Sequence, residues 1–412
     1  MIKKYTYGNP FFTESVVASF EASEGMPEVG TVNLDNGFSF LYDMKAEDAV
    51  YGLGEANRGI NKRGYKYISN NTDIPNHHED IYSLYASHNF VVISGERTFG
   101  LYIDYPSSLV FDIGYTKMDE LHIFCDKADL DLYVITGESI YDIVKQFRQM
   151  IGKSYIAPKF AFGFGQSRWG YKTPEDFAYV VKKYRENHIP IDMVYMDIDY
   201  MDHYKDFTIN EAFGDFSEYV EELKKENIRL IPIIDAGVKI EEGYDVYEEG
   251  VANNYFCKRE DGSDFVAAVW PGYTHFPDVL NPEARKWFGG KYKLLTDAGI
   301  EGFWNDMNEP AIFYTPEGVC EVKEAMREFI DKEESVDDVW GIRDMVADLA
   351  NNAKDYASMY HNMNGKMVRH DQVHNLFGYN MTRAAGEALR EICPEKRCLL
   401  FSRSSYIGMH RY

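Results

Sequence analysis

The sequence lacks any long apolar run, and this absence excludes one class of protein at once. No stretch of its 412 residues approaches the roughly 20 consecutive apolar residues that a bilayer-spanning helix needs. The first ten residues contain two lysines without an apolar run behind them, so they do not form a secretory signal. We therefore expect no membrane partner.

Positive charge and cysteine are also scarce. The 43 Lys and Arg residues are outnumbered by 67 Asp and Glu residues, giving a net charge of −24, which would repel nucleic acid but not a neutral ligand. The cysteines are odd in number and scattered, unlike a disulfide framework. Only Cys393 and Cys398 are close enough in sequence to leave a pairing open. We predict reduced thiols and a cytoplasmic location.

The two parts of the chain differ in their patterns of apolar residues. Residues 1–137 contain short β-type runs separated by turn signals, such as Phe90–Ser94 and Leu130–Ile135, with no helical pattern between them. Strands without intervening helices indicate a β-sandwich. Residues 138–152 space their apolar positions helically and end at Gly152, which predicts a linker helix between two domains.

Residues 153–412 alternate between apolar runs and amphipathic segments, which indicates parallel βα units. Strands are predicted over residues 160–166, 193–199, 229–235, 302–308 and 398–403, and helices over about 174–187, from about 217, after Asn281 and over 379–392. Two segments, about 236–280 and 311–372, interrupt this alternation as insertions.

Polar residues stand at the ends of the predicted strands: Asp197, Asp235, Asp306 and Arg403. In a (β/α)8 barrel, these carboxyl ends converge on one active face. A doubly wound sheet would carry a glycine-rich phosphate turn, and Gly163–Gly165 lacks the third glycine. We therefore predict an N-terminal β-sandwich followed by a (β/α)8 barrel. Five βα strands can be counted before Tyr412, so the barrel is expected to be incomplete.

Residues 302–310 are the most informative stretch of the second part. An apolar approach leads to Asp306, and strand alternation would place Trp304, Asp306 and Asn308 on one face. An aromatic ring beside a carboxylate on the same surface could hold a sugar and attack it.

The segment Trp304–Glu309 resembles the nucleophile motif of the glycoside hydrolase family 31 α-glucosidases. Other matching motifs follow in the expected order: Tyr51–Glu55, Arg168–Tyr171, Asp197–Asp202, Val269–Gly272, His374–Gly378 and Ser402–Ser404. This resemblance implies a retaining, exo-acting α-glucosidase. It would release glucose from the non-reducing end of malto- or isomalto-oligosaccharides through a covalent glycosyl-enzyme, without a cofactor.

The resemblance also implies roles for individual residues. Asp306 would be the nucleophile, with Glu309 supporting it, and Asp197 would bind hydroxyl groups of the terminal glucose. Arg403 is the candidate cation that keeps Asp306 ionised, although it could grip sugar hydroxyls or pair with a structural acid instead. Asp197 and Asp199 would share one strand face, so they could not straddle a glycosidic bond.

The remaining candidates would line the pocket. The aromatic walls are Trp169, Trp270 and Trp304, and Ile233 and Met307 add apolar surface. Asp235 is as compatible with a structural role as with ligand binding. Asp73, in a loop of the sandwich, is placed at the leaving-group sugar.

In the resembled family, the general acid/base is an aspartate shortly downstream of the position of Arg403. Nothing here corresponds to it. We therefore expect this chain to be an N-terminal portion of a longer or split enzyme, nearly inactive alone, with its remaining C-terminal part or a second copy as partner.

Several alternatives stay open. The chain could be a non-catalytic carbohydrate-binding fragment, or a transglucosylase or α-xylosidase of the same family, although α-xylosidases tend to carry Lys-Thr-Asp-Phe-Gly-Glu where this chain has Trp-Asn-Asp-Met-Asn-Glu. The pairs His77–His78 and His370–His374 lack a third ligand at a characteristic spacing, so no metal site is predicted.

Overall fold

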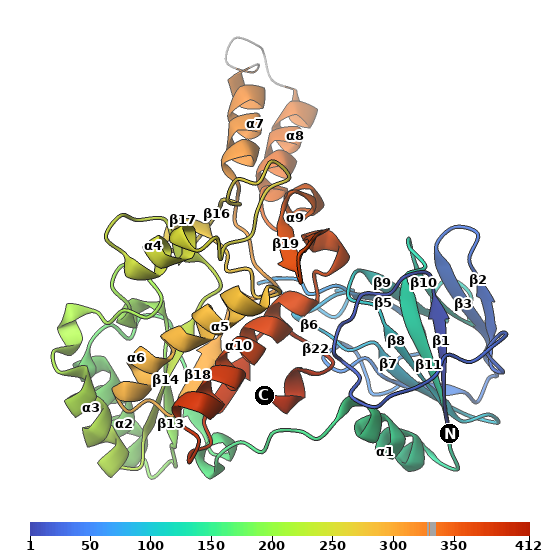
Figure 1. The fold of residues 1–412 in the computed structure, drawn as a ribbon, viewed down its shortest axis with the longest axis horizontal. Coiled ribbons are helices and arrows are strands. Elements are labelled where there is room, and N and C mark those ends of the chain that lie inside the picture. Colours follow the sequence, from blue (N-terminus) through green and yellow to red (C-terminus); the bar gives the residue numbers. More distant parts are fainter. Residues whose placement is uncertain (328, 330–334) are drawn as a thin grey trace. The chain divides into compact units, whose positions relative to one another are not determined.

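The computed structural model describes residues 1–327, 329 and 335–412 (Figure 1). The chain divides into two compact units. Unit 1 contains Met1–Tyr155, Gln372–Tyr379 and Ser404–Tyr412, and unit 2 contains Ile156–Asp371 and Asn380–Arg403. Within the described residues, no helix combines the length and apolarity that a membrane crossing requires.

Unit 1 contains a β-sandwich, as predicted. One antiparallel sheet has the order β1 (Ile2–Tyr7), β11 (Leu130–Thr136), β8 (Phe99–Asp104), β7 (Phe90–Ser94), β4 (Ala49–Gly52). The other has the order β2 (Thr31–Asn33), β3 (Phe38–Asp43), β10 (Glu120–Cys125), β9 (Leu109–Ile113), β5 (Tyr65–Ser69). A short parallel pair joins β6 (Ala86–Ser87) and β22 (Ser405–Tyr406). Alternate residues of both sheets form one apolar core.

Helix α1 (Ile140–Ile151) covers the outer face of the first sheet. Ser139 caps its first turn, and the backbone of Gly152, with φ +94°, ends it. Its Phe147 ring contacts Tyr102 of β8, so β8 is buried on both faces. The predicted linker helix is thus packed on the sandwich.

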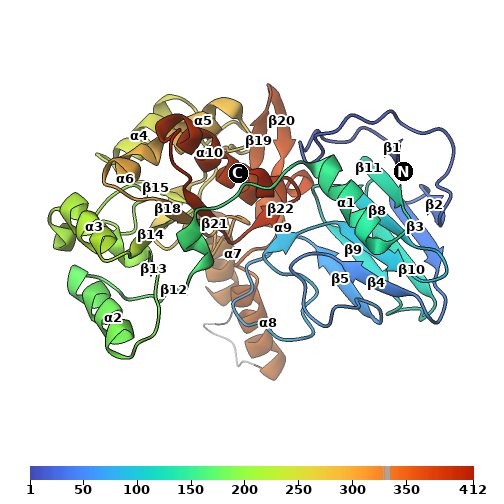
Figure 2. The ribbon, with the colours of Figure 1, turned by 90° about the horizontal axis from the view of Figure 1, so that it is seen from below.

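Unit 2 is built on five parallel strands in sequential order: β12 (Gly165–Gln166), β13 (Met193–Met196), β14 (Arg229–Ile234), β18 (Gly302–Asn305) and β21 (Leu399–Ser402). The connecting helices are α2 (Pro174–Glu186), α3 (Phe216–Lys225), α5 (Pro282–Lys291), α6 (Lys293–Asp297) and α10 (Leu376–Ile392), whose residues from Asn380 belong to this unit. Figure 2 shows a curled sheet with α3, α6 and α10 on its outer side. The prediction of an incomplete (β/α)8 barrel is confirmed.

Two of the predicted helix starts are confirmed in detail. Thr173 and Asp176 form a reciprocal capping box ahead of α2, with Pro174 at the first helical position. The side chain of Asn281 caps α5 by accepting a hydrogen bond from the Glu283 amide. These caps depend on neighbouring residues only, which is why the sequence reveals them.

The predicted lengths of the first two barrel strands were wrong. Residues Lys159–Phe162 form a 3-10 helix (η1), so only Gly165–Gln166 of the first predicted strand pairs. The second predicted strand ends at Met196 and is followed by a 3-10 helix, η2 (Ile198–Tyr200). Asp197 and Asp199 therefore do not share a strand face, because the chain turns as it leaves the sheet.

Strand β18 is also shorter than predicted. It ends at Asn305, and Met307 has φ +55°, so strand alternation does not extend to Asn308. The predicted common face of these three residues is wrong.

Two groups of elements interrupt the alternation. Between β14 and α5 lie α4 (Asp245–Ala252) and a small sheet of β15 (Val238–Lys239), β17 (Gly272–His275) and β16 (Ala267–Val269). Between β18 and α10 lie α7 (Pro316–Arg327), α8 (Val336–Ala347), α9 (Ala353–Ser358) and the hairpin β19 (Tyr360–Met363) and β20 (Lys366–Arg369). Of the predicted insertion 311–372, residues 328 and 330–334 lie outside the described residues. Further 3-10 turns are η3 (Glu211–Phe213), η4 (His370–Gln372) and η5 (Met409–Arg411).

Candidate active site

The carboxyl edge of the parallel sheet carries the predicted polar residues. Asp197, Asp235, Asp306 and Arg403 are each the first residue after their strands, β13, β14, β18 and β21. Because parallel strands end at one edge, the four side chains converge there, and electrostatic interactions connect Asp235 with the other three. The predicted placement at the strand ends is confirmed.

Arg403 organises this edge through two carboxylates. Its Nε and second terminal nitrogen donate to Glu309 Oε1 and Oε2 at 2.9 and 2.7 Å, a bidentate pair. The same Nε lies 3.1 Å from Asp306 Oδ1. The Nε hydrogen of Arg403 points to Glu309. Asp306 Oδ1 therefore forms an ion pair with Arg403 but accepts no hydrogen bond from any described residue. Glu309 thus supports Asp306 indirectly, by holding the cation beside it.

Asp306 is largely but not completely enclosed. Its side chain keeps 10% of its surface open, while Oδ1 itself is shielded. The pKa of Asp306 is raised from the usual 3.8 to about 7, chiefly by burial; Arg403 opposes this rise, and the charges of Glu309 and Asp197 add to it. The carboxyl is therefore poised to exchange its proton near neutral pH, and part of it reaches the surface.

The loop after β18 is fixed to the end of β21. Asn308 donates from Nδ2 to Ser402 Oγ at 3.0 Å, and Arg403 donates to the sulfur of Met307 at 3.4 Å. The Asp306 amide donates to the Ile234 carbonyl at 2.9 Å, continuing the ladder with β14. Three neighbouring strand ends therefore set the position of Asp306.

Sequence reasoning missed one carboxyl of this edge. Asp206, in the loop after η2, is 1% exposed and accepts a hydrogen bond from the Asp235 amide at 2.9 Å. Burial raises the pKa of Asp206 and of Asp235 well above the usual range, and the charges of Asp206 and Asp306 raise that of Asp235 further. Burial also raises the pKa of Asp197. No local pattern marks Asp206, because its partner lies 29 residues away.

The predicted aromatic residues separate into two groups. Trp169 and Trp270 are 63% and 46% exposed, with ring centroids 6.2 Å apart, and Trp270 packs edge-on against Phe313 at 5.0 Å. Trp304 instead packs against Tyr195 among the barrel strands, with the ring centroids 6.1 Å apart. Ile233 pairs with Trp304 across β14 and β18 and is 1% exposed, so its side chain adds little open wall.

An open pocket of about 980 Å³ lies beside the first aromatic group. Its lining includes Trp270, Asp199, Lys172 and Tyr204. Lys172 Nζ stands 3.9 Å from Asp199 Oδ1, so the pocket wall carries both signs of charge. This volume lies at the upper end of the range for small-ligand sites, and neutral polar ligands suit such a wall.

Two sets of predicted residues remain. Asp73 is a half-buried residue of unit 1, and its role at a leaving-group sugar stays a prediction. Of the two histidine pairs, His77 contacts the Tyr85 hydroxyl, and His374 donates to the Asn71 carbonyl at 2.6 Å.

A shielded carboxyl with a raised pKa, a cation 3.1 Å away and exposed tryptophans are compatible with a carbohydrate-active site of the glycosidase class. The lining of the open pocket includes Trp270 but neither Asp306 nor Arg403. Residues 154–412 match the Glycosyl hydrolases family 31 TIM-barrel domain, and residues 7–112 match the Glycosyl hydrolase 31 N-terminal galactose mutarotase-like domain. The chain therefore belongs to glycosyl hydrolase family 31.

Individual relatives agree with this assignment. The chain is 32% identical over 372 residues to Alpha-glucosidase 2 of Bacillus thermoamyloliquefaciens, covering 90% of this chain and 43% of the relative. It is 28% identical to Alpha-xylosidase 1 of Arabidopsis thaliana, covering 89% and 42%. The fold is similar to a family 31 dextranase of Flavobacterium johnsoniae in complex with glucose, with a TM-score of 0.77, 23% identity and coverage of 92% and 42%. The chain thus spans less than half the length of these three proteins.

Proposed function

We propose that this protein is a retaining, exo-acting α-glucosidase in which Asp306 attacks the anomeric carbon of a terminal α-linked glucose. The bond from this carbon to the leaving oxygen breaks, and a bond to an Asp306 oxygen forms. Water then attacks the same carbon and releases glucose with its configuration retained.

One observation carries this proposal: Asp306 is the first residue after β18, with Arg403 Nε 3.1 Å away and an open fraction of its side chain. A nucleophilic carboxylate must be ionised, and the adjacent guanidinium favours that state. Trp169 and Trp270 offer apolar faces to the sugar ring, and Asp197 offers acceptors to its hydroxyls. Glucose as the sugar is supported by the name of the bacterial relative.

The proton donor for the leaving oxygen is not assigned to a residue of this chain. Glu309 is fully buried and both its oxygens accept from Arg403, which leaves it unsuited to that role. A test of the nucleophile must therefore use a leaving group that needs no proton.

Trapping with 5-fluoro-α-glucosyl fluoride meets this requirement, because fluoride departs unassisted. We expect mass spectrometry to find one added fluoroglucosyl group on the peptide that contains Asp306. Because Asp306 attacks only when ionised, the trapping rate should rise as the pH increases through about 7.

The matched controls are Asp306→Asn, which should not be labelled, and Asp261→Asn, an exposed carboxyl outside the pocket lining, which should be labelled like the unchanged chain. Label on another residue, or none on a folded chain that binds the reagent, would refute the nucleophile. Binding without label would instead support a non-catalytic carbohydrate-binding protein.

An α-xylosidase is the second candidate, because one relative carries that name. A xylosyl unit lacks the hydroxymethyl group of glucose. Comparing 5-fluoro-α-xylosyl fluoride with the glucosyl reagent separates the two: faster labelling by the glucosyl compound supports the α-glucosidase. Release of the trapped sugar that accelerates with added maltose would indicate a transglucosylase.

Trp270→Ala tests the aromatic wall. Losing the indole face is expected to raise the reagent concentration for half-maximal labelling by about tenfold, equivalent to about 1.4 kcal/mol, with little change in the maximal rate. Trp340→Ala is the matched control, since Trp340 on α8 is similarly exposed, 51% against 46%, but lines no part of the pocket. Equal effects of the two substitutions would remove Trp270 from the sugar site.

A further inference from the structure

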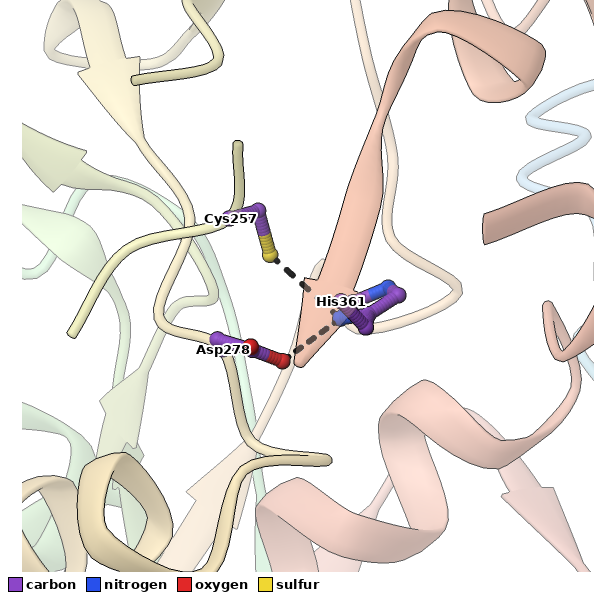
Figure 3. A group of neighbouring side chains, drawn as sticks. All are labelled: Cys257, Asp278 and His361. Carbon is purple, nitrogen blue, oxygen red and sulfur yellow. Dashed lines mark hydrogen bonds and ion pairs between the residues drawn. The ribbon is translucent and has the colours of Figure 1, made fainter. Parts of the chain in front are cut away.

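Three buried side chains of unit 2 meet outside the candidate active site (Figure 3). Cys257, between α4 and β16, Asp278, ahead of α5, and His361, on β19, place one potential ligand atom each within 4.8 Å of one another. They are 0%, 3% and 0% exposed. The function proposed above uses none of them.

The distances fit a tetrahedral metal site in part. Cys257 Sγ lies 3.6 Å from His361 Nδ1, and Zn–S and Zn–N bonds of about 2.3 and 2.0–2.1 Å at a tetrahedral angle give a separation of about 3.6 Å. His361 Nδ1 lies 2.7 Å from Asp278 Oδ1, where tetrahedral zinc requires about 3.3 Å. A metal would therefore replace this hydrogen bond and move the carboxylate by about 0.6 Å.

His361 and Asp278 are each already oriented by a further group. His361 Nε2 lies 2.8 Å from His370 Nδ1, and Asp278 Oδ2 accepts from the Asn362 amide at 2.7 Å. Partners of this kind fix the ring and the carboxylate of metal ligands in proteins. The cluster thus has both ligands and the groups that hold them.

The geometry does not suit a nucleophilic cysteine. In a Cys-His-Asp catalytic arrangement, the thiol and the carboxylate contact opposite nitrogens of the imidazole. Here both contact Nδ1, while Nε2 faces His370, and Cys257 is fully buried. Substrate could not reach the sulfur.

We propose that Cys257, Asp278 and His361 bind a structural Zn²⁺ ion, with water or the Pro277 carbonyl as fourth ligand. Thiolate, imidazole and carboxylate together are a donor set that zinc accepts readily. Binding releases the thiol proton of Cys257 to solvent. His361 then carries its proton on Nε2, where His370 Nδ1 accepts it.

The ion would join segments that are distant in the sequence. The backbone already pairs Cys257 with Phe276 and Lys258 with Tyr360. Zinc would add a cross-link between the α4–β16 segment, the start of α5 and β19. It would thereby brace the loops that carry Trp270 and Phe313, without entering the reaction.

The test is metal binding by the whole chain after removal of metal with a chelator. With Zn²⁺ we expect about one ion per chain by mass spectrometry of the metal, and with Co²⁺ a thiolate-to-cobalt charge-transfer band in the near ultraviolet. Cys257→Ser should lose the band, whereas Cys320→Ser, which removes an exposed thiol on α7, should keep it.

A second variant avoids dependence on a ligand substitution that could prevent folding. His370→Gln leaves all three ligands in place and should weaken Zn²⁺ binding about 10- to 100-fold. No stoichiometric metal on the unchanged chain, a charge-transfer band retained by Cys257→Ser, or unaltered affinity in His370→Gln would each overturn the proposal.

Discussion

Replacing Glu309 by alanine is expected to destabilise unit 2 by about 3–5 kcal/mol. Glu309 is fully buried and neutralises Arg403, whose side chain is only 20% exposed, through two hydrogen bonds. Removing the carboxylate leaves a guanidinium that is mostly shielded from water without its bidentate partner. Loss of one partner of a buried ion pair is costly for this reason.

Urea unfolding followed by tryptophan fluorescence measures this effect in the correct unit. All five tryptophans lie between residues 169 and 340, within unit 2. Glu317→Ala is the matched control. Glu317, on α7, also pairs with an arginine, Arg259, at 2.9 Å, but its side chain is 54% exposed, so we expect a loss of at most about 1 kcal/mol. Equal losses would contradict the assigned role of burial.

Glu309→Gln refines the same prediction. The amide keeps the shape of the side chain but removes its charge, and this charge contributes to raising the pKa of Asp306. Arg403 is also freed to interact more closely with Asp306. The pH at which trapping by the fluoroglucosyl reagent is half-maximal should therefore fall below about 7. An unchanged pH profile would show that Glu309 does not act on Asp306.

Asp306→Asn is expected to abolish trapping and, at the same time, to stabilise unit 2 by about 1–4 kcal/mol at pH 8. The folded-state pKa of about 7 exceeds the unfolded value of 3.8, so ionised Asp306 opposes folding. This cost is absent below about pH 4, grows between about pH 4 and 7, and is constant above. The asparagine variant lacks it at every pH.

The sign of the stability change in Asp306→Asn, and its dependence on pH, identify the cause of the change. Urea unfolding at pH 5 and pH 8 should show a larger advantage of Asp306→Asn at pH 8. Asp202→Asn should behave oppositely, because Lys205 and His203 lower the pKa of Asp202, and its ionised form therefore favours folding. A loss of stability in Asp306→Asn, or a gain that does not change with pH, would contradict the burial cost assigned to the ionised carboxyl.

The sequence predicted the parts of this fold that depend on neighbouring residues. Thr173 and Asn281 cap the helices that follow them, and Gly152 ends the helix before it. It also predicted that Asp197, Asp235, Asp306 and Arg403 stand at strand ends. Polar residues that interrupt an apolar run mark such ends, although the exact last paired residue depends on the partner strand.

Predictions that extended strand alternation past the sheet failed. Asp197 and Asp199 are separated by a turn into η2, and Met307 leaves the strand conformation immediately after Asp306. Alternation holds only while the backbone keeps the extended strand conformation. A sequence does not show where the neighbouring strand stops.

The sequence by itself determined the family, the barrel strands and the identity of the acid at the end of β18, because each of these rests on residues a few positions apart. Only the tertiary structure decided which groups face that acid. Arg403 is shared between Asp306 and Glu309, Asp206 holds Asp235, and Cys257 meets His361 across 104 residues. Such contacts arise when the sheet curls and the inserted segments pack, and no periodicity in the chain encodes them.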